Sequence, residues 1–92
     1  MNTATTIEAK LRAAFAPTRL AVTDDSARHA GHAGARPGGE THFSVEIVSQ
    51  AFAGQSRVAR HRLVYGLLAD EIAGGVHALA VTALTPAEDG GR

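Results

Sequence analysis

Apolar residues recur every three or four positions near the start of the chain, which is the spacing of one face of an α-helix. These positions are Ile7, Leu11, Ala14 and Phe15. Thr5 and Glu8 match the S/T-x-x-E pattern of a capping box, so the helix is expected to begin after Thr5. Pro17 cannot continue a helix and marks its end.

Two later stretches alternate between apolar residues and smaller or polar ones, as β-strands with one buried face do. In the first, Leu20 and Val22 are the apolar residues, and turn-forming residues from Asp24 to Ser26 end the stretch. In the second, His42–Ser49, every other residue is large and apolar: Phe43, Val45 and Ile47. Both stretches are predicted to be strands, and the second is the clearer of the two.

The segment 27–41 between these strands is rich in glycine and has almost no large apolar side chain. It cannot bury enough apolar surface to offset the entropy lost on folding. Loops of this length are unusual in a compact domain, and they are usually functional or disordered. We therefore predict a flexible loop over 27–41.

A second helix is predicted over Ser56–Ala73, after a turn around Phe52 to Ser56. Gly74 and Gly75 are able to provide the residue that follows its C-terminus. The apolar face of this helix consists of Val64, Leu67, Leu68 and Ile72. The charged residues are expected on its solvated side: Arg57, Arg60, Arg62, Asp70 and Glu71.

The last element, Val76–Leu84, is apolar on both faces apart from His77 and Thr82. This pattern predicts either a central strand covered on both sides or a strand that runs parallel to a neighbour. Residues 86–92 include a proline and several glycines, and they are interpreted as a frayed tail.

The predicted order is helix, strand, strand, helix, strand. A strand, a helix and a strand in succession normally form a right-handed crossover between parallel strands, whereas the first two strands are free to be antiparallel. The expected fold is therefore α+β, with a small three-stranded mixed sheet and the helices packed on one face. A chain of 92 residues has room for one domain, here 1–92.

Composition removes several functional classes. Nine basic and nine acidic residues cancel, so the protein has no general electrostatic attraction to nucleic acid or anionic lipid. There is no cysteine, so any metal must be held by imidazole or carboxylate, or by ligands from a partner. No apolar run approaches the roughly 20 residues of a membrane span, and we expect a soluble, cytoplasmic protein without a membrane partner.

Five segments, in order and spacing, resemble the BolA family over a region from about Ile7 to Glu88. They are Asp25-Ser26 with His29, Glu40-Thr41-His42-Phe43, Val48-Ser49 with Phe52 and Gly54, Arg60-His61-Arg62-Leu63-Val64-Tyr65, and Val76-His77-Ala78-Leu79. The resemblance implies a class II KH-like α+β fold, which agrees with the element order inferred from periodicity.

The resemblance also implies a partner and a cofactor. BolA proteins pair with monothiol glutaredoxins, and the two proteins can share a [2Fe-2S] cluster ligated by a glutaredoxin cysteine, a glutathione thiol and two BolA side chains. By position these BolA ligands are His77 and, in the long loop, His29, with His32 as a substitute. Two imidazoles form an incomplete site, so no cofactor is expected in the isolated chain, which we expect to be a monomer or weak homodimer.

The spacing of the histidines does not by itself establish a metal site. His77 at the start of a strand is compatible with a hydrogen bond to the backbone, and His29 and His32 are compatible with exposed loop residues. His61 is interpreted as a histidine that fixes helix to sheet through a hydrogen bond. His42 is interpreted as a residue that closes the loop.

A second hypothesis assigns the chain to another class, since some bacterial BolA proteins are described as DNA-binding transcriptional regulators. Arg57, Arg60 and Arg62 of the second helix would then contact phosphates, and binding would weaken as salt is added. A third possibility is a heterodimer with glutaredoxin that holds no metal. No catalytic triad, P-loop or dinucleotide motif is present, and we predict that the protein is not an enzyme.

Overall fold

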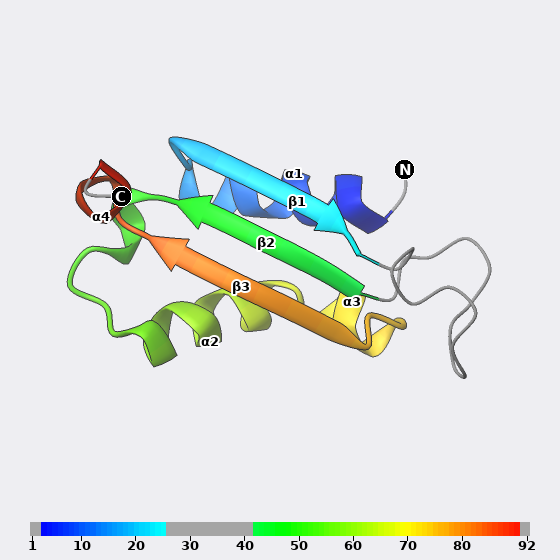
Figure 1. Ribbon diagram of the computed structural model, residues 1–92. Helices are drawn as coiled ribbons and strands as arrows, with labels where there is room; N and C mark the ends of the chain where they lie inside the picture. Colours follow the sequence, from blue (N-terminus) through cyan, green and yellow to red (C-terminus); the bar gives the residue numbers. More distant parts are fainter. Residues whose placement is uncertain (1–2, 26–41, 91–92) are drawn as a thin grey trace.

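The computed structural model describes residues 3–25 and 42–90 (Figure 1). Three strands and the helices follow one another in the predicted α+β order, with additional short helices between and after them. In chain order the elements are α1 (Thr3–Phe15), β1 (Arg19–Asp24), β2 (His42–Val48), η2 (Gln50–Phe52), α2 (Arg57–Leu67), α3 (Ala69–Ala73), β3 (Ala78–Leu84) and α4 (Pro86–Gly90).

The strands form one mixed sheet in the order β1-β2-β3. β1 is antiparallel to β2, with Val22 opposite Val45, and β2 is parallel to β3, with Val45 opposite Val81. Figure 1 shows α1 and α2 on the same side of this sheet. The predicted mixed sheet with helices on one face is therefore confirmed.

The prediction of a central last strand is wrong, because β3 lies at the edge of the sheet. The other reading of the same pattern, a strand parallel to its neighbour, is confirmed. Ala78, Ala80 and Thr82 are exposed on the face without helices. Small alanine side chains look apolar in the sequence but lose little by facing water, which is why the pattern suggested two covered faces.

The hydrophobic core lies between the helices and the adjacent face of the sheet. Its buried side chains come from α1, β2, η2, α2 and β3 and from Leu68 and Val76, which lie between elements, and most of the predicted apolar positions are among them. Ala14 and Ile72 are exceptions, because both are exposed, Ile72 with 38% of its surface. The core consists of Ile7, Leu11, Phe43, Val45, Ile47, Phe52, Val64, Leu68, Val76 and Ala83.

The helix boundaries differ from the prediction at two places. α1 already includes Thr3, so Thr5 lies inside the helix and does not cap it. The second predicted helix is divided at Leu68 into α2 and α3. Leu68 leaves the helical conformation with φ −99° and ψ 17°, yet its side chain is fully buried. The start and the end are as predicted, because the Ser56 hydroxyl accepts a hydrogen bond from the Ala59 N–H and the glycines follow α3.

The C-terminal segment predicted to fray is a short helix over Pro86–Gly90. The Thr85 N–H donates to the Glu88 carboxylate (2.7 Å), and the Glu88 N–H donates to the Thr85 hydroxyl (3.2 Å). This reciprocal pair is a capping box, with Pro86 at the first helical position, where its missing N–H is not needed. The sequence signal for α4 was therefore present in Thr85-Pro86-Ala87-Glu88.

Candidate functional site

Two histidines lie side by side where β2 and β3 begin. Because these strands are parallel and His42 is opposite Ala78, His77 lies beside His42 at the same end of the sheet. The two ring centroids are 6.3 Å apart, with one ring edge facing the other ring. His77 is exposed and His42 is half-buried. The fold thus places a second imidazole, that of His42, beside the predicted ligand His77. This position is in addition to the role of closing the loop that the sequence suggests for His42.

Residues 26–41 leave and re-enter the described part of the chain next to this histidine pair. The Asp25 N–H donates to the His42 carbonyl at 2.7 Å, and the Ser44 hydroxyl donates to the Asp25 carboxylate. These bonds hold the two ends of the segment together. The predicted ligands His29 and His32 lie outside the described residues, so their approach to His77 stays a prediction.

The chemistry available here is that of imidazole nitrogen. A neutral imidazole binds iron or zinc through a ring nitrogen, and two imidazoles leave a metal without a full ligand set. Among the described residues no group of three or more His, Cys, Asp or Glu side chains is arranged to hold a metal ion. Any cluster bound at His77 therefore needs ligands from residues 26–41 or from another protein.

Arg60 was predicted to lie on the solvated side of its helix, and this prediction is wrong. Only 7% of Arg60 is exposed. Its guanidinium donates to the carbonyls of Gln55 and Ala83, each at 2.9 Å, and to the Glu88 carboxylate at 2.7 Å. A guanidinium engaged in this way is not placed to contact phosphates.

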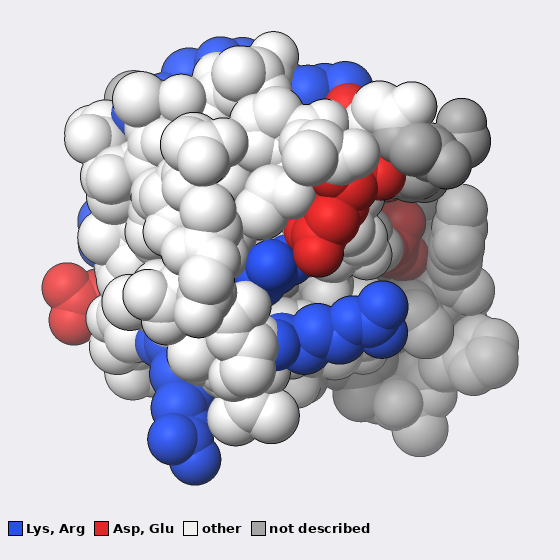
Figure 2. Space-filling model, turned by 90° about the vertical axis from the view of Figure 1, so that its left-hand side faces the viewer, with Lys and Arg blue, Asp and Glu red and all other residues white. Residues whose placement is uncertain are grey.

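Arg57 and Arg62, the other two arginines of α2, are exposed. Figure 2 shows the end of the molecule that carries α4, where basic and acidic side chains lie next to one another around a hollow. This face therefore presents mixed charge instead of a continuous basic surface. The nucleic-acid hypothesis now rests on Arg57 and Arg62, and it stays a prediction.

The hydrogen bond that was expected from His61 to the sheet comes instead from a neighbour on the same helix. The Tyr65 hydroxyl donates to the Leu79 carbonyl at 2.7 Å. The His61 ring lies edge-on to the Tyr65 ring, with centroids 6.1 Å apart. His61 itself lines a groove between α2 and β3 and has no hydrogen bond to the described part of the sheet.

Glu88 makes folding sensitive to acid. The Arg60 guanidinium, followed by the Thr85 N–H, lowers the pKa of Glu88 from 4.5 to about 2. A carboxyl group whose pKa is lower in the folded state stabilises the fold above pH 4.5, and this contribution is lost as the pH falls toward 2. At pH 6 we expect the wild-type protein to unfold at a higher urea concentration than the Glu88→Gln variant. This difference in urea midpoint should shrink as the pH falls from 4.5 to 2.

Circular dichroism of both proteins at a series of pH values measures this difference. Asp70→Asn is the matched control, because Asp70 is exposed and its carboxylate has no ion pair within the described residues. A wild-type advantage over Glu88→Gln that stays constant across this range would contradict the linkage of Glu88 protonation to folding.

The comparisons with known proteins identify the family. The family described as BolA-like protein matches residues 11–88, so the chain belongs to the BolA-like family. It is 52% identical to "SufE-like protein 1, chloroplastic/mitochondrial" from Arabidopsis thaliana, over 89% of this chain. It is also 52% identical to "Uncharacterized protein in cobS 5'region" from Sinorhizobium sp, over 96% of each chain.

Solved structures agree with this assignment. BolA1 from Arabidopsis thaliana superimposes with a TM-score of 0.86 at 46% identity, covering 96% of both chains. The BolA domain of SufE1 from the same organism gives a TM-score of 0.84 at 48% identity, covering 96% of this chain and 98% of that one. The BolA fold predicted from the sequence is thereby confirmed.

The relatives differ in length and in the location that their names give. The chain spans 23% of SufE-like protein 1 and 56% of Arabidopsis "Protein BOLA1, chloroplastic", but 96% of the Sinorhizobium protein. Names that specify chloroplasts or mitochondria leave the expected cytoplasmic location a prediction. Within residues 3–25 and 42–90, no helix is long and apolar enough to cross a membrane.

Proposed function

We propose that this BolA-like protein is a non-enzymatic adaptor that binds a monothiol glutaredoxin and ligates a shared [2Fe-2S] cluster through His77. The observation that carries the proposal is the exposed imidazole of His77 at the start of β3, beside His42. An exposed ring nitrogen is accessible to a metal centre that a second protein presents. The cluster is cargo that the two proteins hold together.

The available donors fit a cluster that is shared between two proteins. Imidazole replaces thiolate on one iron of Rieske clusters, so histidine is a competent ligand for [2Fe-2S] centres. This chain contains no cysteine, so its contribution is limited to imidazole and carboxylate. The thiolate ligands must come from the partner and glutathione, which is why the adaptor needs a glutaredoxin.

Chain length allows His29 to reach the region beside His77. His29 follows Asp25 by only four residues, and a chain spans at most about 3.6 Å per residue, or roughly 14 Å over this interval. Asp25 is itself bonded to His42, which lies against His77. His32, seven residues after Asp25, has a longer tether and is the alternative ligand.

The proposal is tested by mixing the protein with a glutathione-loaded monothiol glutaredoxin that carries the cluster. We expect the visible absorption and circular dichroism spectra to change when the wild-type protein is added, because imidazole replaces a ligand on iron. His77→Ala should abolish the change. His61→Ala is the matched control, because His61 lies on α2, away from the start of β3, and this variant should behave as wild type.

Single His29→Ala, His32→Ala and His42→Ala variants then assign the second ligand, and His29→Ala should have the largest effect of the three. A wild-type spectral change in His77→Ala would exclude His77 as a ligand. Analytical ultracentrifugation of the same mixtures separates loss of the cluster from loss of the heterodimer, because a heterodimer that persists without the cluster would still sediment as a pair.

A further inference from the structure

β3 is an edge strand, and part of its main chain is available for pairing. The Ser49 N–H donates to the Leu84 carbonyl at 2.9 Å, so Leu84 and every second residue before it face β2. Leu79, Val81 and Ala83 therefore direct their N–H and C=O groups away from the sheet. A row of such groups is a template for the strand of another chain.

Side chains of α2 cover the two ends of this row. Tyr65 donates to the Leu79 carbonyl at 2.7 Å, and Arg60 donates to the Ala83 carbonyl at 2.9 Å. Val81 lies between these two covered carbonyls, and no strand of the described residues pairs with its outer side. The edge is thus closed at both ends and open at Val81, which suits a short extended segment better than a full strand.

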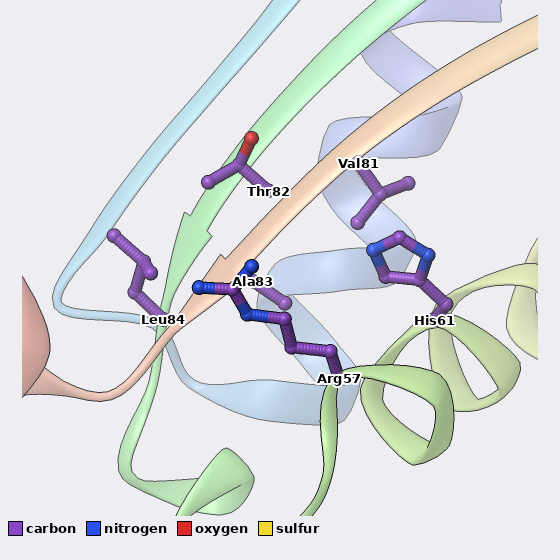
Figure 3. Close-up of a pocket in the computed structure, with 6 residues that line it drawn as sticks. All are labelled: Arg57, His61, Val81, Thr82, Ala83 and Leu84. Atoms are coloured by element: carbon purple, nitrogen blue, oxygen red, sulfur yellow. The ribbon is translucent and has the colours of Figure 1, made fainter.

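A groove of about 270 Å³ runs along this open part of the edge. In Figure 3, the Arg57 side chain extends toward β3, and the His61 ring points toward Val81. Arg57, His61 and Tyr65 are spaced four residues apart, so they form one row on α2 that faces the strand. The groove is lined by Arg57, His61, Val81, Thr82, Ala83 and Leu84.

Charge selects the kind of segment that fits. Arg57 is exposed and has no carboxylate partner within the described residues. Arg60 and Arg19, in contrast, are paired with Glu88 and Asp89. Because these pairs neutralise Arg60 and Arg19, this end of the molecule (Figure 2) has no continuous basic surface for a ligand with a negative charge on every residue or nucleotide. One uncompensated arginine suits a single carboxylate.

We propose that the outer edge of β3 binds an extended segment of a partner protein that carries one acidic side chain. The segment pairs through its main chain with the N–H and C=O of Val81 and with the N–H of Ala83, and its carboxylate pairs with Arg57. This surface is separate from His77, because Val81 follows His77 by four residues, or roughly 13 Å along the strand. The proposal therefore holds whether or not His77 ligates a cluster.

The test uses the whole, metal-free protein labelled with ¹⁵N and short synthetic peptides of Val and Thr with one central Glu. Backbone amide shifts should concentrate at Val81 and Ala83. The same peptide with Gln should bind roughly three- to fivefold more weakly, which is the effect of one exposed ion pair. Arg57→Gln should weaken the Glu peptide by the same factor, whereas the control Arg62→Gln should leave its affinity unchanged.

Main-chain pairing is tested without altering the protein. One Glu peptide is N-methylated at its odd-numbered residues and a second at its even-numbered residues. Each has therefore lost the N–H donors along one of its two edges. One of the two should bind roughly fivefold more weakly, because it has lost the hydrogen bond to the Val81 carbonyl. Equal affinity of both methylated peptides, or no shift at Val81 and Ala83, would overturn strand addition.

Two further outcomes would assign a different ligand to the groove. Larger shifts at the same amides with a single-stranded oligonucleotide would assign the groove to nucleic acid. Shifts that grow with protein concentration, in the absence of peptide, would assign it to a second copy of this chain. Either result contradicts the proposal, and neither depends on a metal centre.

Discussion

Replacing Arg60 with alanine is expected to lower the free energy of unfolding by roughly 2–4 kcal/mol. The guanidinium of this buried residue donates to the carbonyls of Gln55 and Ala83 and to the carboxylate of Glu88. Alanine would leave the Ala83 carbonyl, at the buried end of the network, without a donor, and would remove the partner of Glu88. Three elements, α2, β3 and α4, would lose their common contact.

Urea unfolding followed by circular dichroism at pH 7 measures this change. Arg62→Ala is the matched control, because Arg62 is an exposed arginine on the same helix and should change stability by less than about 0.5 kcal/mol. Arg60→Lys should recover only part of the loss, since an ammonium group cannot reproduce the planar fork of donors. Equal stability of the Arg60→Ala and Arg62→Ala proteins would show that the network contributes nothing to folding.

Phe52→Ala is expected to have the largest effect of a single core substitution, roughly 3–5 kcal/mol. Phe52 is fully buried, and its ring centroid lies 5.0 Å from that of Phe15. The chain has three phenylalanines and no tryptophan, so few other side chains are large enough to fill the space left by this ring. The remaining cavity would separate η2 from α1.

Thermal unfolding provides the measurement for Phe52. A loss of at least 3 kcal/mol corresponds to a fall in Tm of more than about 12 °C for a domain of this size. Leu63→Ala is the control, because Leu63 is an apolar residue with 44% of its surface exposed, and its Tm should stay near that of the wild type. A Tm within a few degrees of wild type in Phe52→Ala would refute the role of this ring in the core.

Hydrophobic periodicity predicts the strands of the sheet, but it does not predict that the second helix is divided at Leu68. β1 and β2 were predicted because strict alternation has only one interpretation at this length. The break at Leu68 has no proline or glycine to signal it, and it depends on how the buried leucine packs. The charge of Arg60 suggests a solvated position, but the residue is buried. Its spacing of four from Val64, which is four from Leu68, places it on the buried row.

The candidate site depended more strongly on tertiary structure. The sequence singled out His77, but its proximity to His42 arises from the register between two parallel strands that are far apart in the chain. No local pattern encodes that register. The signal that was available is that both histidines stand at the starts of predicted strands and that a crossover between these strands is expected to make them parallel.

The hydrogen bond between Asp25 and His42 makes the region beside His77 a junction at which the intervening segment can be replaced. The two points at which residues 26–41 join the sheet are held one bond apart, and closing a longer loop costs only about 0.6 kcal/mol for each doubling of its length. Sequences of other lengths, carrying other donor atoms, can therefore be exchanged at this junction while the His77 imidazole, directly before β3, stays fixed. Evolution or design can vary the chemistry of this end without redesigning the core.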